Sequence, residues 1–131
     1  MIRPVNDFRI GNLVLDEDGE LCKIEQLSSE KMECFQQVSN IENKSCISTK
    51  YPSNIYAIEL TEEWLLKLGF FKHVKFKNTY VKGSFSIKIT DRGVIYFKYN
   101  DFVIAELQFI HQLQNLYFAL CGEELVFSTE P

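Results

Sequence analysis

Apolar and polar residues alternate over short stretches in the first 60 residues of this 131-residue chain. Residues typical of turns separate these stretches, and the pattern is typical of several short strands. Asp16-Glu17-Asp18-Gly19 predicts a tight turn, because Gly readily takes a positive φ. The expected strands are Leu13–Leu15, Glu20–Leu27, Met32–Val38 and Ile55–Leu60, separated by turns or loops that include Ser28–Lys31 and Ser39–Asn54.

A short helix is expected over Thr61–Leu68. Thr61 can accept a hydrogen bond from a backbone N–H that the helix leaves unpaired, and Glu62 and Glu63 suit the positive end of the helix dipole. Gly69 predicts the C-terminal end of the helix. Because so short a helix is not stable alone, we expect it to lie against a sheet and to link two units.

The rest of the chain predicts an antiparallel β-meander covered by a C-terminal helix. The expected strands are Phe70–Phe76, Tyr80–Val81, Phe85–Thr90, Val94–Tyr99 and Phe102–Ile110. Alternation is sharpest in the third strand, where Phe85, Ile87 and Ile89 are expected to face the core. Lys88 should then face solvent. A period of 3.6 from His111 to Cys121 predicts the helix. Its apolar stripe comprises Leu113, Leu116, Tyr117 and Leu120.

These patterns together predict an α+β fold with two parts. Residues 1–60 are expected to form a small SH3-like β-barrel, since closing the sheet removes its exposed edges. Residues 61–131 are expected to form the helix, the antiparallel sheet and the C-terminal helix. We expect the two parts to share one core.

Charge is sorted by position along the chain. Residues 1–60 carry six basic and ten acidic side chains, residues 61–100 carry eight and three, and residues 101–131 carry none and five. The formal net charge of −4 therefore hides a basic centre between two acidic flanks. A basic centre rich in Phe and Tyr is typical of a surface that binds nucleic acid or an acidic protein.

The residues predicted to bind a partner are those of the basic centre. They are Lys72, Lys75, Lys77, Tyr80, Lys82, Lys88, Arg92 and Lys98. If Lys75 and Lys77 share one strand face and Lys88 lies on a neighbouring strand, their ammonium groups form a stripe, to which Tyr80 and Tyr99 can add stacking. The alternative is a lysine-rich solvent face that keeps the sheet soluble and blocks pairing at its edges. The dominance of Lys over Arg weakens the nucleic-acid interpretation, because Lys lacks the bidentate fork of Arg.

No group of residues in the sequence specifies a cofactor or a metal site. Cys22, Cys34 and Cys46 are spaced by twelve, whereas zinc sites usually supply ligands in close pairs, so buried thiols are expected. His73 is expected to be a solvated residue of the basic strand, with pH sensing or phosphate contact as the alternative. His111 at the start of the last helix is expected to bond to local backbone, with orientation of a ligand as the alternative.

We expect the protein not to be an enzyme. His111 and Cys121 are ten residues apart on one predicted helix, which separates them by roughly 15 Å along its axis and excludes a Cys-His dyad there. A thiol-dependent hydrolase that uses Cys121 or Cys22 is the weaker alternative. No apolar run approaches the roughly 20 residues of a membrane span, and Met1–Ile10 does not match a secretory signal. We therefore expect a cytoplasmic protein with reduced cysteines and no membrane partner.

Three stretches resemble a family of small uncharacterised proteins of Bacteroidetes genomes and of their phages and mobile elements. These are Arg9-Ile10-Gly11-Asn12-Leu13-Val14, Thr61-Glu62-Glu63-Trp64-Leu65-Leu66-Lys67-Leu68-Gly69-Phe70 and His111-Gln112-Leu113-Gln114-Asn115-Leu116-Tyr117-Phe118-Ala119-Leu120-Cys121-Gly122-Glu123-Glu124-Leu125, which cover 31 of 131 positions. The chain departs from the family by Cys121 in place of a Thr and by Tyr56-Ala57-Ile58-Glu59 in place of a segment containing Pro.

The resemblance brings no activity and no functional residue, but it implies a setting. Small phage and mobile-element proteins without a catalytic signature are often adaptors or inhibitors of host defence. The resemblance therefore implies a non-catalytic interaction protein in a bacterial host cell, most concretely an inhibitor of a defence complex such as an RNA-guided (CRISPR) nuclease. Its partner would be a host protein or ribonucleoprotein with an acidic or RNA surface. The alternative is a nucleic-acid-binding module that uses the basic sheet directly.

Overall fold

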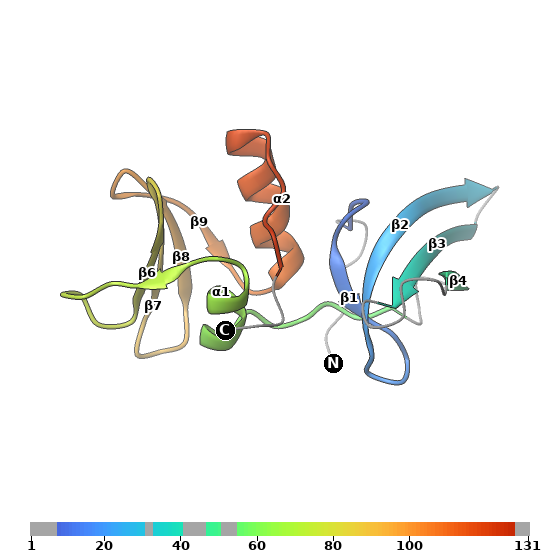
Figure 1. The fold of residues 1–131 in the computed structure, drawn as a ribbon, viewed down its shortest axis with the longest axis horizontal. Helices are drawn as coiled ribbons and strands as arrows, with labels where there is room; N and C mark the ends of the chain where they lie inside the picture. The colour runs from blue at the N-terminus through green and yellow to red at the C-terminus, as the bar shows by residue number, and fades with distance from the viewer. Residues whose placement is uncertain (1–7, 31–32, 41–46, 51–54, 128–131) are drawn as a thin grey trace. The chain divides into compact units, whose positions relative to one another are not determined.

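The computed structural model describes residues 8–30, 33–40, 47–50 and 55–127 (Figure 1). For 26–30, 33–40 and 47–50 only the backbone is described. The chain divides into two compact units, Met1–Ile58 and Glu59–Pro131. The boundary lies close to the expected one after Leu60. Cys46 and residues 51–54 of the expected loop lie outside the described residues.

The first unit contains a four-stranded antiparallel sheet in the order β1-β2-β3-β4. The strands are β1 (Leu13–Leu15), β2 (Leu21–Glu30), β3 (Glu33–Asn40) and β4 (Ile47–Lys50). The turn between β1 and β2 is the predicted one. Asp16 Oδ1 accepts hydrogen bonds from the backbone N–H of Asp18 and of Glu20, both at 2.9 Å. Gly19 takes a φ of 80° there.

The fourth strand differs from the prediction. It lies at Ile47–Lys50, inside the expected loop Ser39–Asn54, and it pairs with β3 through Val38 and Ser48. Alternation did not reveal it because the strand has only four residues, although Ile47 and Thr49 are β-branched. The expected strand Ile55–Leu60 is not regular.

Among the described residues the sheet of the first unit stays open. β1 and β4 stand at opposite ends of the strand order. Tyr56 forms an isolated antiparallel bridge with Leu15, with N···O distances of 2.9 and 3.0 Å. The fold is therefore α+β with antiparallel sheets, and the expected closed SH3-like barrel is not found.

The Arg9-Ile10-Gly11-Asn12 stretch is a closed turn before β1. The backbone N–H of Arg9 donates to Asn12 Oδ1 at 2.6 Å, and Asn12 is fully buried. Gly11 has a φ of 95°, and its N–H donates to the carbonyl of Ile24 at 2.8 Å. A positive φ and a buried side-chain amide explain why Gly and Asn occupy these two positions.

The second unit is a five-stranded antiparallel meander in the order β5-β6-β7-β8-β9. The strands are β5 (Phe71–Lys72), β6 (Thr79–Lys82), β7 (Phe85–Ile89), β8 (Ile95–Tyr99) and β9 (Phe102–Leu107). Helices α1 (Glu62–Lys67) and α2 (Ile110–Cys121) lie on one side of this sheet (Figure 1). Phe85, Ile87 and Phe97 are buried on the helix-covered side, with Phe85 and Phe97 stacked at 5.4 Å.

Helix α1 begins and ends as predicted. Thr61 Oγ1 accepts from the backbone N–H of Trp64 at 3.4 Å. At the other end, Gly69 takes a φ of 93° and the N–H of Phe70 donates to the carbonyl of Leu65 at 3.0 Å. This 6→1 bond is the signature of a Schellman end, and the buried side chains of Phe70 and Leu65 complete it.

Helix α2 covers the sheet, but its buried stripe is not the predicted one. Leu113 and Tyr117 are buried, and the Tyr117 ring lies 5.2 Å from that of Phe85. Leu120 is 46% exposed, so its predicted place in the core is wrong. The buried stripe is instead Ile110, His111, Leu113, Gln114 and Tyr117. The apolar pattern did not predict this stripe because two of its residues, His111 and Gln114, are polar.

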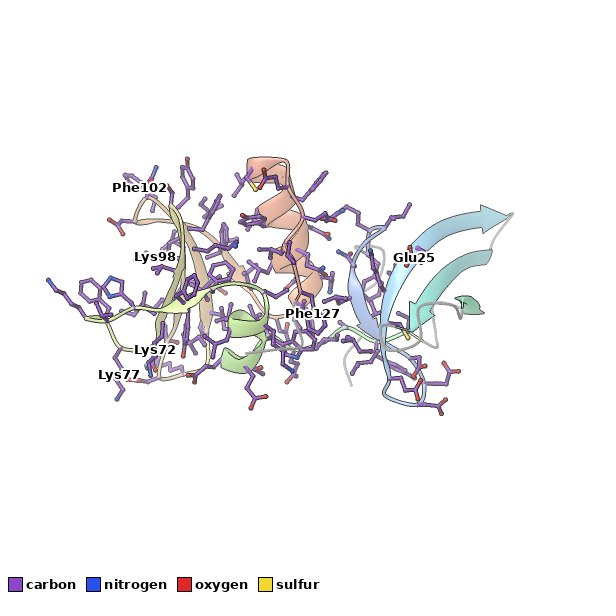
Figure 2. The ribbon with its side chains drawn as sticks, in the orientation of Figure 1. Glu25, Lys72, Lys77, Lys98, Phe102 and Phe127 are labelled. Atoms are coloured by element: carbon purple, nitrogen blue, oxygen red, sulfur yellow. The ribbon has the colours of Figure 1, made fainter. Side chains whose placement is uncertain are left out.

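The chain after α2 returns to α1. Leu125 is buried, and the Phe127 ring lies 5.3 Å from that of Trp64 (Figure 2). Lys67 Nζ lies 5.1 Å from the centroid of the Trp64 ring. Trp64 therefore contacts a phenyl ring and a cation, and the C-terminal segment is part of the fold of the second unit.

Candidate functional site

The side of the five-stranded sheet away from α1 and α2 is a candidate binding surface, which we call the open face. Residues directly opposite each other in antiparallel strands point to the same side, so the strand register defines this face. One row across it is Phe71, Val81, Ser86, Lys98 and Val103. The next row is Thr79, Lys88, Tyr96 and Glu106. None of the nine side chains is buried.

Two of the predicted cations lie on the open face. Lys88 is exposed on β7, opposite Tyr96 of β8. Lys98 is half-buried on β8, opposite Ser86, and is labelled in Figure 2. The predicted outward orientation of Lys88 is thus confirmed.

Lys75 and Lys77 lie in the loop that joins β5 to β6. The expected strand Phe70–Phe76 ends at Lys72, so Lys75 and Lys77 do not share a strand face. Both are exposed, and Figure 2 shows Lys77 projecting from this loop. They flank the sheet at the end of its first hairpin.

Lys72 and Lys82 do not belong to the open face. Lys72 lies opposite the buried Tyr80, so it is on the helix-covered side, at the edge strand where its head stays exposed. Lys82 lies opposite Phe85, and its Nζ comes within 2.9 Å of the position that a Cβ on Gly69 would take. A cation at this place is favourable, because it is near the C-terminal end of α1.

Arg92 lies in the turn between β7 and β8 and is exposed. The predicted stripe is therefore not continuous. The structure brings Lys88 and Lys98 together on the sheet and places the other predicted cations at its ends and edges.

Tyr80 has no place on a partner surface, and its predicted stacking role is wrong. Its side chain is 2% exposed, on the side of the sheet that carries the helices. Burial, together with a hydrogen bond to Glu62, raises the pKa of Tyr80 to about 12. Tyr99 lies on the same side, where its ring contacts that of Phe85 at 5.1 Å.

Two other aromatic side chains occupy the open face, and the sequence analysis missed both. Phe71 is 72% exposed on β5, and Tyr96 is half-buried on β8. Alternation within the strand was the signal that could have found Tyr96, because Tyr96 lies between Ile95 and Phe97, which are both buried. Phe71 was hidden by its neighbour Phe70, which enters the core.

The side chain of His73 organises the β5–β6 loop. His73 Nδ1 accepts hydrogen bonds from the backbone N–H of Lys75 at 3.0 Å and of Phe76 at 3.1 Å. The imidazole also lies 4.7 Å from the Phe76 ring. The loop exposes Val74 at 95% and Phe76 at 63%. His73 therefore organises a turn, and the expected solvated strand histidine is not found.

The stretch from residue 64 to residue 90 contains six lysines and no Asp or Glu. Glu63 and Asp91 are the nearest carboxylates along the chain. On the open face the two rows carry one carboxylate, that of Glu106 on the edge strand β9. The field over β5, β6 and β7 is therefore positive, which favours an anionic partner.

The cysteines and histidines show no catalytic arrangement in the described part of the chain. Cys22 is buried, and its Sγ lies 3.9 Å from Asp16 Oδ2, where a carboxylate disfavours a thiolate. Cys121 is exposed, whereas His111 is buried and stacks on Phe109 at 5.8 Å. Burial, a hydrogen bond to Cys121, and the nearby Cys121 and Glu123 raise the pKa of Tyr117.

Within residues 8–30, 33–40, 47–50 and 55–127, no group of three or more His, Cys, Asp or Glu side chains is placed to hold a metal ion. No described helix combines the length and the hydropathy that crossing a bilayer requires. No protein-family model matches the chain, and no curated protein or solved structure is significantly similar to it.

Proposed function

We propose that this chain is a non-catalytic binding protein whose second unit contacts an anionic macromolecular surface. The observation that carries the proposal is the uninterrupted positive stretch from residue 64 to residue 90, which includes β5, β6 and β7 and holds six lysines and no Asp or Glu. Lys75, Lys77 and Lys88 are exposed within it. Electrostatic complementarity of this kind speeds association, and exposed apolar side chains nearby lengthen the life of the complex.

The most concrete form of the proposal is an inhibitor of a host defence complex, such as an RNA-guided nuclease, in a bacterial cytoplasm. The resemblance to proteins of phages and mobile elements supports this setting. The lysines would contact either an acidic side of the protein or the RNA that it holds.

Charge reversal tests the proposed surface. Tagged wild-type protein and the K75E/K77E double variant are used to capture partners from the natural host, and the captured proteins and nucleic acids are quantified. We expect at least one partner to be retained by the wild type and reduced several-fold with the variant, while the melting temperature stays nearly unchanged. If that partner is a nuclease, an excess of the protein should slow its cleavage.

Lys23→Glu is the matched control, because Lys23 is exposed on β2 of the first unit. It makes the same charge reversal at a single residue outside the positive stretch, which is half of the charge change in K75E/K77E. Equal capture by the wild type, K75E/K77E and K23E would reject the surface.

For the first unit we also propose an SH3-like barrel. The supporting observation is the bridge between Tyr56 and Leu15, which adds the segment after β4 to the free edge of β1. In a closed barrel, residues 55–58 would pair with β1 on one side and with β4 on the other. Slow amide exchange throughout 55–58 would support closure, and exchange at unfolded rates there would contradict it.

A second candidate function is direct binding of nucleic acid. It is favoured by Phe71 and Tyr96, whose rings share the open face with Lys88 and Lys98.

A further inference from the structure

From this arrangement we infer that the open face is a binding platform for single-stranded nucleic acid, with Phe71 and Tyr96 as stacking residues and Lys88 and Lys98 as phosphate contacts. The inference rests on the proposed function and names the partner class of the same surface.

The open face offers flat aromatic side chains on an uncovered sheet. Phe71 is 72% exposed, and Tyr96 lies three strands away with part of its ring accessible. Neighbouring strands are about 4.8 Å apart, so the two rings are separated by roughly 14 Å across the sheet. Bases that stack on aromatic side chains contribute affinity in a sequence-tolerant way, because every base has a π face. The separation of the rings leaves room for one or two nucleotides between the stacked bases.

Cations stand next to these rings. Lys88 is directly opposite Tyr96 in the register, which places the two Cβ atoms about 5 Å apart. Lys98 shares the other row with Phe71, and Ser86 between them supplies a hydroxyl for hydrogen bonding. The flexible lysine side chains can reach phosphates on either side of a base stacked on Tyr96.

Charge is distributed unevenly across the open face, which favours one path for a bound nucleic-acid strand. Lys75 and Lys77 extend the positive surface beyond β5, whereas Glu106 stands opposite Tyr96 on the edge strand β9. A strand of nucleotides is therefore expected to run from β8 toward the β5–β6 loop and to avoid β9.

Single-stranded nucleic acid fits these features better than the two alternatives. In a duplex the bases are stacked on one another, so their faces are not available to Phe71 and Tyr96. An acidic protein would pair with the lysines but would not require two aromatic rings on the same face of the sheet. The acidic protein is one of the outcomes of the test.

The test uses the full chain and a fluorescein-labelled oligothymidylate of about 12 nucleotides, within the usual range of site sizes. Fluorescence anisotropy at about 50 mM salt measures its dissociation constant, and a salt series measures the number of phosphate contacts. We expect binding that weakens steeply with salt. Phe71→Thr and Tyr96→Thr should each weaken binding about tenfold, which is the scale of one lost stacking contact. Lys88→Glu should weaken it by at least as much and lower the salt slope.

Lys23→Glu and Val126→Thr are the matched controls for charge and for apolar exposure. Lys23 is exposed in the other unit, and Val126 is 77% exposed after α2, away from the sheet. Both should bind the oligonucleotide as the wild type does. Circular dichroism establishes that each variant is folded. Because Phe71 is largely exposed, F71T keeps the test decisive even if Y96T folds poorly.

Glu106→Gln supplies a gain-of-binding arm. Removing the one carboxylate of the face should tighten oligonucleotide binding by two- to threefold, and this result cannot come from damage to the fold. Glu63→Gln, an exposed carboxylate of α1, should have no such effect.

Three results would overturn the inference. The first is no binding of the oligonucleotide at low salt, and the second is wild-type affinity for both F71T and K88E. The third is that polyglutamate of the same charge displaces the labelled oligonucleotide as well as unlabelled oligothymidylate does, and that F71T binds the oligonucleotide as the wild type does. This result would identify an acidic protein as the partner class. In the third case the proposed function stands and only the nucleic-acid inference fails. If neither the oligonucleotide nor polyglutamate binds, both fail.

Discussion

Tyr80 in the middle of β6 is hydrogen-bonded to Glu62 in the first turn of α1. The phenol ring is buried, and it connects the sheet to the helix that precedes it. This contact explains why Tyr80, although it lies within the basic centre of the sequence, supports the fold instead of binding a partner. It also gives the second unit a dependence on alkaline pH that can be measured.

The first prediction concerns alkaline unfolding. Burial and the nearby carboxylate hold the phenol neutral in the folded state, with a pKa of about 12 against 10.0 for an ordinary tyrosine. The stabilisation is therefore complete below pH 10 and is lost as the pH rises toward 12. Tyr80→Phe should remove this part of the pH dependence. Urea unfolding followed by the fluorescence of Trp64, the single tryptophan, measures it.

Tyr99→Phe is the control, since Tyr99 is 40% exposed. It should retain the alkaline loss of stability of the wild type. The same pH dependence in Y80F and in the wild type would contradict the assignment.

The second prediction concerns the end of α1. Gly69 has a φ of 93°, so Gly69→Ala should lower the free energy of unfolding by about 1–2 kcal/mol. The added Cβ would also meet Lys82 Nζ, but this is the end of a flexible side chain that can move away. We therefore expect Lys82→Ala not to rescue G69A. Gly83→Ala isolates the backbone effect, because it has a φ of 60° with no atom within 4 Å of the added Cβ. Urea unfolding should give similar losses for both, and a much larger loss for G69A that K82A repairs would show a steric effect instead.

The third prediction concerns the β1–β2 turn. Asp16→Ala removes the acceptor of two backbone N–H groups and should lower the stability of the first unit by about 2 kcal/mol. Asp16→Asn keeps an acceptor oxygen, so its stability should lie between those of D16A and the wild type. Amide exchange at Asp18 and Glu20 measures the effect locally. Asp18→Ala, whose side chain is exposed, should leave the exchange at Glu20 unchanged.

The fourth prediction concerns the β5–β6 loop. His73→Ala should speed amide exchange at Lys75 and Phe76, because Nδ1 accepts a hydrogen bond from each. His73→Asn should preserve much of the protection, since its side-chain oxygen can accept the same bonds. Unchanged exchange in H73A would show that His73 does not organise the loop. Thermal melting should change little, because the loop is exposed.

Local chemistry in the sequence predicted the second unit well. The alternation of Phe85 and Ile87, the N-cap Thr61 and the helix-ending Gly69 each specify their element within a few residues, and all three are confirmed. The α+β class with a covering C-terminal helix follows from the change of period near residue 110.

The features that the sequence did not predict depend on contacts of side chains with backbone groups or with residues distant in the chain. The strand expected over Phe70–Phe76 ends at β5 because His73 turns the chain with its own ring nitrogen, which no apolar pattern records. Tyr80 lies on the helix-covered side of the sheet because it is opposite Ile87, and this register is known only once the strands are paired. The same register places Phe71 and Tyr96 on the open face. A charge count along the chain could find the lysines of the candidate site but not its aromatic residues.

The short pairing between Glu59 and Phe109 has a consequence for the order in which the second unit assembles. The N–H of Leu60 donates to the carbonyl of Gln108 at 3.0 Å. The first residues of the second unit are therefore paired with the residues just before α2. During synthesis this pairing must wait until all five strands have left the ribosome. We therefore expect nascent chains that stop before residue 108 to leave the segment just before α1 unpaired and open to proteases, and chains that extend through α2 to protect it.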